Sequence, residues 1–112
     1  MTEIKRQWDD SLPPFPKEDI EAITGAARED HIPVCCCFWL FRYLHRQVGA
    51  KAVLLGDYCF GRFSAHLAAL DSVALTDSFA GFLKTDTLRR SDLASYLAFV
   101  RQLPEIVRHE HL

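Results

Sequence analysis

The sequence contains no long hydrophobic run and no block of charge of one sign. Its longest strictly apolar run covers residues 34–41, far short of the roughly 20 residues that a membrane-spanning helix needs. The N-terminal segment MTEIKRQWDD is too polar for a secretory signal peptide. The net charge is −2, and the cationic residues are spread along the chain, so we expect no nucleic-acid partner. These absences predict a cytoplasmic protein with no transmembrane segment.

Spaced cysteines, which a disulfide framework or a zinc site would need, are also missing. Three of the four cysteines are adjacent, Cys35, Cys36 and Cys37, and neighbouring cysteines form a disulfide only with strain. On a helix their side chains point about 100° apart and cannot converge on one metal ion. We interpret them as small core residues that stay reduced. The pair His109 and His111 lacks a third ligand, so we expect no metal site there either.

Catalytic motifs are the third absence. Ser64 and His66 would diverge on one helix, and no orienting group accompanies them. Residues 56–61, GDYCFG, do not have the glycine pattern of a phosphate-binding loop. We therefore predict no catalytic residues and no cofactor, and a metal- or thiol-dependent enzyme is the least favoured function class.

Helical periodicity is what the chain does have. Apolar residues repeat at helical spacing in five segments, and no segment alternates as a half-buried strand would. The expected helices span 17–29, 33–48, 50–70, 76–85 and 92–103, with a polar loop over 84–90. We expect Gly49 to end the second helix, Thr76 and Ser91 to begin the fourth and fifth, and Pro104 to stop the last. The prediction is an all-α protein, a compact bundle of about five helices.

The chain length of 112 residues fits one domain. Residues 1–16 read as an irregular arm, because SLPPFP holds three of the five prolines. Residues 17–104 form the single helical domain, and residues 105–112 a C-terminal tail. Apolar residues make up 49% of the chain, at the upper end of the usual range. Self-association or a partner subunit is therefore expected.

Two glycines interrupt the predicted helix over residues 50–70. A glycine inside a helix costs up to about 1 kcal/mol relative to alanine, so Gly56 and Gly61 suggest close approach by another helix. Gly61 also shares a strip of small or polar side chains with Ser64 and Ala68. A neighbouring backbone or a ligand could lie against this strip.

Asp57 also lies on that strip, within an apolar helix, where a carboxylate must be hydrogen-bonded, ion-paired or turned to solvent. In the structural interpretation it caps a neighbouring helix or pairs with an arginine such as Arg42 or Arg62. In the functional interpretation it belongs to a binding site. The sequence leaves both open.

The segment KAVLLGDYCFGRFSAHLAAL, residues 51–70, resembles a helix of isoprenyl (polyprenyl) diphosphate synthases that typically reads A-V-L-x-G-D-Y/F-L. The matching residues are Ala52, Val53, Leu54, Gly56, Asp57 and Tyr58. Catalytic members carry two aspartate-rich D-D-x-x-D-type motifs that hold Mg²⁺ against a diphosphate, and this chain has none. It is therefore similar to the small non-catalytic subunits of two-component synthases in bacterial quinone-side-chain synthesis.

This resemblance implies an accessory subunit in isoprenoid biosynthesis that is no enzyme on its own. The helix over 52–68 would face the catalytic partner or the channel for the growing chain, with Cys59, Phe60 and Phe63 as wall residues. The binding residues that it implies are Gly56, Asp57, Tyr58, Cys59, Phe60, Gly61 and Phe63. The alternative is a stand-alone homodimeric binding module of unknown ligand, in which Gly56 and Asp57 serve packing alone.

Overall fold

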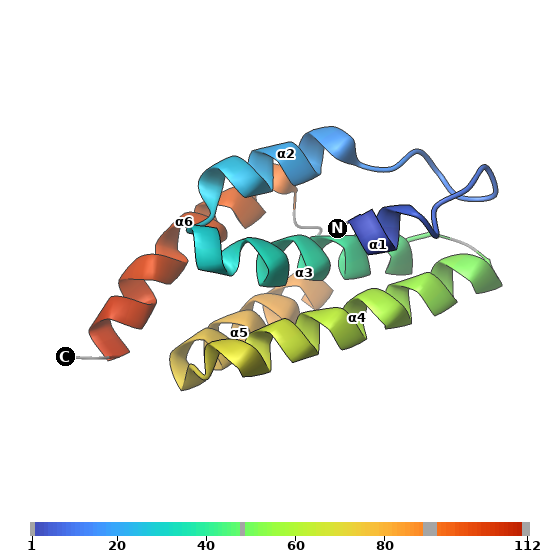
Figure 1. Ribbon diagram of the computed structural model, residues 1–112. Helices are drawn as coiled ribbons and strands as arrows, with labels where there is room; N and C mark the ends of the chain where they lie inside the picture. The colour runs from blue at the N-terminus through green and yellow to red at the C-terminus, as the bar shows by residue number, and fades with distance from the viewer. Residues whose placement is uncertain (1, 48, 89–91, 111–112) are drawn as a thin grey trace.

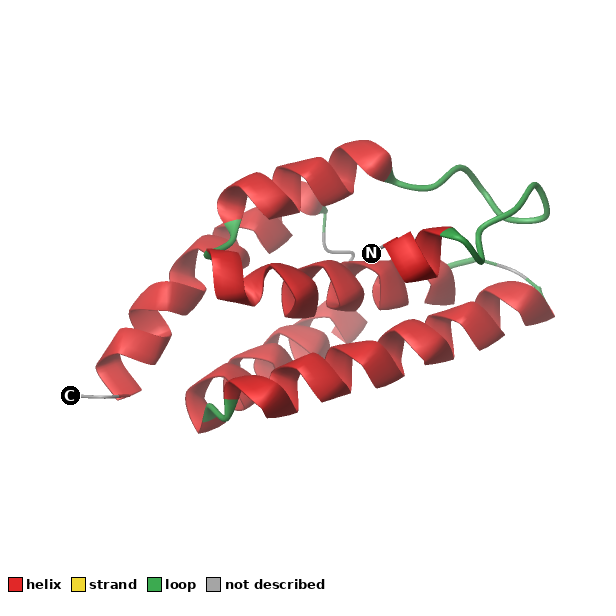
Figure 2. Cartoon of the chain, in the orientation of Figure 1, coloured by secondary structure: helices red, strands yellow, loops and turns green. Residues whose placement is uncertain are grey.

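The computed structural model describes residues 2–47, 49–88 and 92–110, and these form an all-α compact globule, as predicted (Figures 1 and 2). The described residues contain five helices of ten or more residues and one helix of four, and no strand. The elements are α1 (Thr2–Lys5), α2 (Lys17–Ala26), the 3₁₀ turn η1 (Glu29–His31), α3 (Ile32–His45), α4 (Ala50–Leu70), α5 (Val73–Leu88) and α6 (Leu93–Glu110). No helix among the described residues is both long and apolar enough to cross a membrane.

Helix α3 lies at the centre of the molecule, between α2 and α4 (Figure 1). Most of its side chains are apolar, so it can bury surface on every side. The Phe38 ring lies 5.2 Å from the rings of both Phe63 and Phe79, which join α4 and α5 to the core. The Tyr96 hydroxyl of α6 donates a hydrogen bond of 2.5 Å to the backbone carbonyl of Cys35.

None of the four cysteines forms a disulfide, and all four are buried. This agrees with the interpretation of the adjacent cysteines as core residues. Burial raises the pKa of the Cys35 and Cys59 thiols to about 12. These thiols are therefore protonated and unreactive near neutral pH.

Several helix ends differ from the predicted ones. Helix α2 ends at Ala26, before the 3₁₀ turn, and α3 ends at His45. Gly49 has a φ of 124° and is the N-cap of α4, so it starts the next helix instead of ending α3. This positive φ suits glycine because it has no side chain.

The caps of α5 and α6 also differ. Ser72 is the cap of α5, since its hydroxyl accepts a hydrogen bond of 3.1 Å from the Leu75 amide. Thr76 instead lies inside the helix and donates to the Ser72 carbonyl. The Asp92 carboxylate accepts from the Ser95 amide at the start of α6, which lowers the Asp92 pKa. The predicted cap Ser91 lies outside the described residues.

The prediction that Pro104 stops the last helix was wrong. Helix α6 continues through Pro104 to Glu110, so residues 105–110 of the expected tail are helical. Ile106 and Val107 pack against the core on this last stretch, and such packing offsets the proline penalty. The Glu110 carboxylate then accepts hydrogen bonds from the Ser72 hydroxyl at 2.6 Å and the Ala74 amide at 2.9 Å.

The prediction of a polar loop over residues 84–90 was also wrong for residues 84–88, which belong to α5. Helix α5 extends to Leu88, well beyond the expected end at residue 85. Residues 89–91 lie outside the described residues.

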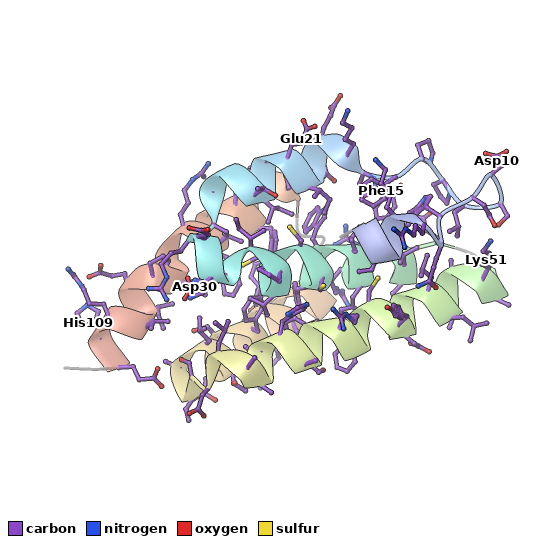
Figure 3. The ribbon with its side chains drawn as sticks, in the orientation of Figure 1. Asp10, Phe15, Glu21, Asp30, Lys51 and His109 are labelled. Carbon is purple, nitrogen blue, oxygen red and sulfur yellow. The ribbon has the colours of Figure 1, made fainter. Side chains whose placement is uncertain are left out.

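The N-terminal arm is held on α3 and α4. Trp8 donates its indole N–H to the Pro13 carbonyl at 2.6 Å, and its ring stacks on Tyr43 of α3 at 6.1 Å. Asp9 forms an ion pair with Lys51 at the beginning of α4. Figure 3 shows Lys51 beneath the loop of the arm that carries Asp10.

Candidate functional site

Helix α4 is one continuous helix from Ala50 to Leu70, as predicted. Gly56 is buried where α4 meets α3: a Cβ atom there would lie 2.4 Å from Cδ2 of His45 and 3.3 Å from Cβ of Leu44. The close approach inferred from this glycine is therefore present. Gly61 differs, since a Cβ atom there would meet nothing within 4 Å. No contact within the described part of the chain explains a glycine at that position.

Asp57 has a partner that the sequence did not suggest. Its Oδ1 lies 3.2 Å from Nε2 of His45 at the end of α3. The His45 ring in turn packs edge-on against Phe41, with ring centroids 4.6 Å apart. This contact supports the structural interpretation of Asp57, because the carboxylate helps to hold α3 and α4 together.

The predicted site residues separate into two groups around α4. Gly56 and Cys59 are buried against α3, and Tyr58 is half-buried. Phe60 and Phe63 instead lie toward α5. Phe60 is 42% exposed and Phe63 is 6% exposed, and both line a hollow.

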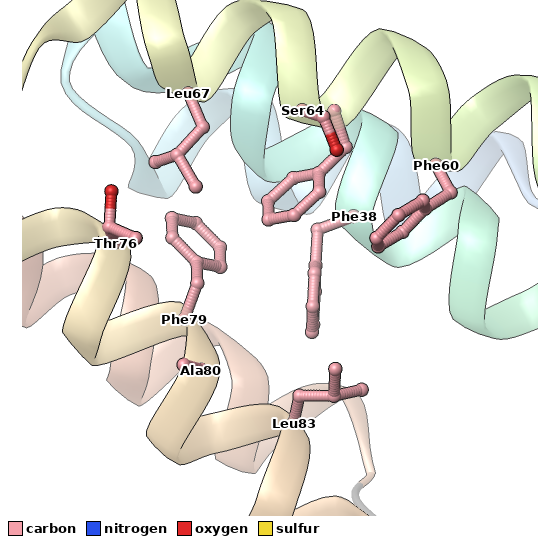
Figure 4. A pocket seen from close by; sticks show the side chains of 9 residues that line it. Phe38, Phe60, Ser64, Leu67, Thr76, Phe79, Ala80 and Leu83 are labelled. Atoms are coloured by element: carbon pink, nitrogen blue, oxygen red, sulfur yellow. The ribbon is translucent and has the colours of Figure 1, made fainter.

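This hollow lies between α4 and α5 and has a volume of about 260 Å³. Phe38 of α3 forms its floor, and Figure 4 shows side chains converging on it from both helices. The lining residues are Phe38, Phe60, Phe63, Ser64, Leu67, Thr76, Phe79, Ala80 and Leu83. Two hydroxyls, those of Ser64 and Thr76, are the polar side-chain groups in this lining.

A second hollow of about 340 Å³ continues the first toward the α4–α5 turn. It shares Leu67 and Thr76 with the first hollow, and Asp71, Ser72 and Val73 close its far end. We call the two hollows together the α4–α5 groove. Val73 at the closed end is 71% exposed, so apolar surface extends beyond the groove.

The groove exists because α5 is held against α6 as well as α3. The Phe99 ring of α6 lies 5.1 Å from Phe79 and 4.6 Å from Phe82. Glu110 fixes the first turn of α5 through Ser72. The hollow lies on the side of α5 that faces α4.

Sequence reasoning missed the α5 half of the groove. Phe79 on α5 is buried, and Leu83 is half-buried. Thr76 was expected to be a cap and Ala80 was not considered. Their place in the groove depends on the angle between α4 and α5, for which the sequence has no local signal.

The chemistry of the groove is apolar contact. Among the residues that the structure describes, no three His, Cys, Asp or Glu side chains come together as a metal-binding group. Asp71 at the closed end has a φ of 48°, a left-handed conformation that aspartate tolerates.

Comparison with protein-family models, with curated proteins and with solved structures finds no match to this chain.

Proposed function

We propose that this chain is a non-catalytic accessory subunit that buries its α4–α5 groove against another protein. The observation that carries the proposal is the apolar groove with partly exposed Phe60 at one end and exposed Val73 at the other. Apolar surface that is contiguous and left open to water is typical of interaction sites. Burying it contributes about 25 cal/mol for each Å² removed from water.

The partner that we propose is a catalytic polyprenyl diphosphate synthase subunit. The support is the resemblance of residues 51–70 to the helix of the small non-catalytic subunits of two-component synthases. On that helix, Phe60 and Phe63 line the groove, where the resemblance expects wall residues. Cys59 is fully buried, so we no longer include it in the proposed wall.

A stand-alone homodimer is the second candidate, and a separate observation favours it. Val53 is 47% exposed and Leu54 is 70% exposed, and both precede the groove on α4. A second copy of the chain could cover them. In that case the light-scattering mass of the purified chain is that of a dimer, and Leu54→Lys returns it to that of a monomer.

The proposal is tested by capturing the partner with matched variants. The tagged chain is purified from its host, and co-purified polyprenyl diphosphate synthase is quantified by mass spectrometry. Ala80→Glu places a carboxylate in the groove and should lower the capture at least about tenfold, since an unpaired charge in an apolar interface is costly. Ala98→Glu is the control, because Ala98 is an exposed alanine on α6.

Both variants should keep the unfolding temperature of the unmodified chain, since both alanines are exposed. Equal capture of the synthase by Ala80→Glu and Ala98→Glu would contradict the proposal. Capture of no synthase by the unmodified chain would contradict the assignment of the partner.

A further inference from the structure

The dimensions of the α4–α5 groove suit a helix. Its α4 wall extends from Phe60 to Asp71, about 16 Å at 1.5 Å per residue. That length equals about three turns of a bound helix. The walls are two helices, and a third helix can pack into the space between two others at interaxial distances of about 8–10 Å.

Hydrogen bonding distinguishes a helix from an extended peptide as the occupant. Both walls are α-helices whose backbone groups are bonded within each helix, so the groove offers no free sheet edge. The Thr76 hydroxyl in the lining already donates to the Ser72 carbonyl at 3.0 Å. An occupant must therefore satisfy its own backbone hydrogen bonds, which a helix does and an extended peptide does not.

The charge at the closed end indicates which polar residues the occupant carries. Asp71 lines the second hollow and is exposed. Asp77 follows the lining residue Thr76 on α5 and is also exposed. Two carboxylates at the same end favour lysine or arginine on the segment that lies beside them.

We propose that the α4–α5 groove binds one amphipathic helix of a partner protein, about three turns long. Its apolar residues, spaced i, i+4 and i+7, lie over Phe60, Ala80 and Leu67, the lining residues that are exposed or half-buried, and its basic residues lie beside Asp71 and Asp77. This inference rests on the proposed function and adds the kind of segment that the partner supplies.

Two synthetic helical peptides test the inference on the full-length chain. They share leucines at i, i+4 and i+7, and one carries two lysines at one end where the other carries two glutamates. Each is titrated into ¹⁵N-labelled protein at low salt. We expect saturable binding with shifts in residues 60–67 and 76–83, and an affinity about tenfold higher for the lysine peptide. Salt of about 0.5 M should reduce this preference.

Variants assign the effect to the groove. Ala80→Glu should abolish binding of both peptides, whereas Ala98→Glu should leave it unchanged. The double variant Asp71→Asn and Asp77→Asn should bring the lysine peptide to the affinity of the glutamate peptide. Asparagine tolerates the left-handed backbone at position 71, so the fold should persist.

Three results would overturn the inference: no saturable binding of either peptide, equal affinities, or shifts outside the groove. A dimer in light scattering that Ala80→Glu dissociates would also overturn it, because a second copy would then fill the groove. If the peptides fail but synthase capture still depends on Ala80, the helix inference falls and the proposed function stands. If the peptides bind as expected but capture does not depend on Ala80, the proposed function falls.

Discussion

The two glycines of α4 should respond oppositely to alanine. In a helix interior, Gly→Ala contributes up to about 1 kcal/mol of stability through helix propensity. At Gly61 a new Cβ meets nothing within 4 Å, so Gly61→Ala should stabilise the protein by nearly that amount. At Gly56 the new Cβ would lie 2.4 Å from the His45 ring and 3.3 Å from the Leu44 Cβ. One of these neighbours must therefore move.

The His45 ring is the group that can move, and its displacement has a cost. The ring would lose its hydrogen bond to Asp57, worth about 0.5–1.5 kcal/mol, and part of its edge-on contact with Phe41, worth a similar amount. Overpacking of this kind typically costs about 1–3 kcal/mol. After the propensity gain, Gly56→Ala should be between neutral and about 2 kcal/mol destabilising.

Urea unfolding followed by circular dichroism at pH 7.5 measures both variants against the unmodified chain. The unfolding free energies of Gly56→Ala and Gly61→Ala should differ by about 1–3 kcal/mol. In the His45→Ala background the cost of Gly56→Ala should shrink, because the ring is gone. If Gly56→Ala stabilises the protein as much as Gly61→Ala does, the close contact between α3 and α4 is refuted.

Three further predictions concern the core and the turn before α3. Tyr96→Phe removes the hydrogen bond to the Cys35 carbonyl. It should lower the free energy of unfolding, measured in urea, by about 1 kcal/mol. An unchanged free energy of unfolding would contradict the buried hydrogen bond. Burial lowers the pKa of His31, so the unfolded chain binds the proton more tightly. The stability from neutral His31 is present above about pH 6.5 and falls as the pH drops through the lowered folded pKa. His31→Gln keeps an acceptor for Arg28. It should flatten the pH dependence of the unfolding temperature between about pH 7 and 5. An unchanged slope would exclude His31 as the source of this pH dependence. A thiol reagent should leave the native protein unlabelled at pH 7.5 and label the four cysteines in denaturant, because all four are buried; rapid labelling of Cys59 in native conditions would contradict its placement.

The sequence predicted α4 well because its periodic signal is long. Leu55, Cys59 and Phe63 recur at helical spacing and are all buried, and their packing outweighs the propensity cost of two glycines. In the helix predicted over residues 92–103, Tyr96, Val100 and Leu103 likewise recur at helical spacing, and all three are buried.

The last turns of α6 were not predictable from local signals. Pro104 indicated a helix end, but the contacts that continue the helix are tertiary. Glu110 reaches the first turn of α5, 38 residues earlier at Ser72. A sequence pattern does not reveal such a pairing.

The candidate site was predicted only in part. Phe60 and Phe63 were predicted from the resemblance of residues 51–70, and both line the groove. The groove itself needs α5 at a particular angle to α4, which depends on the left-handed turn at Asp71 and on the packing of α5 against α6. The contact of Asp57 with His45 was missed because His45 comes from α3 and the contact requires the close approach at Gly56.

Hydrogen–deuterium exchange on the full chain, alone and with a bound synthase subunit, tests most directly whether the groove is the interface. The account predicts slower exchange in residues 60–67 and 76–83 on binding, with exchange in α2 unchanged. Slower exchange confined to α2 or α6, with both groove segments unaffected, would contradict it.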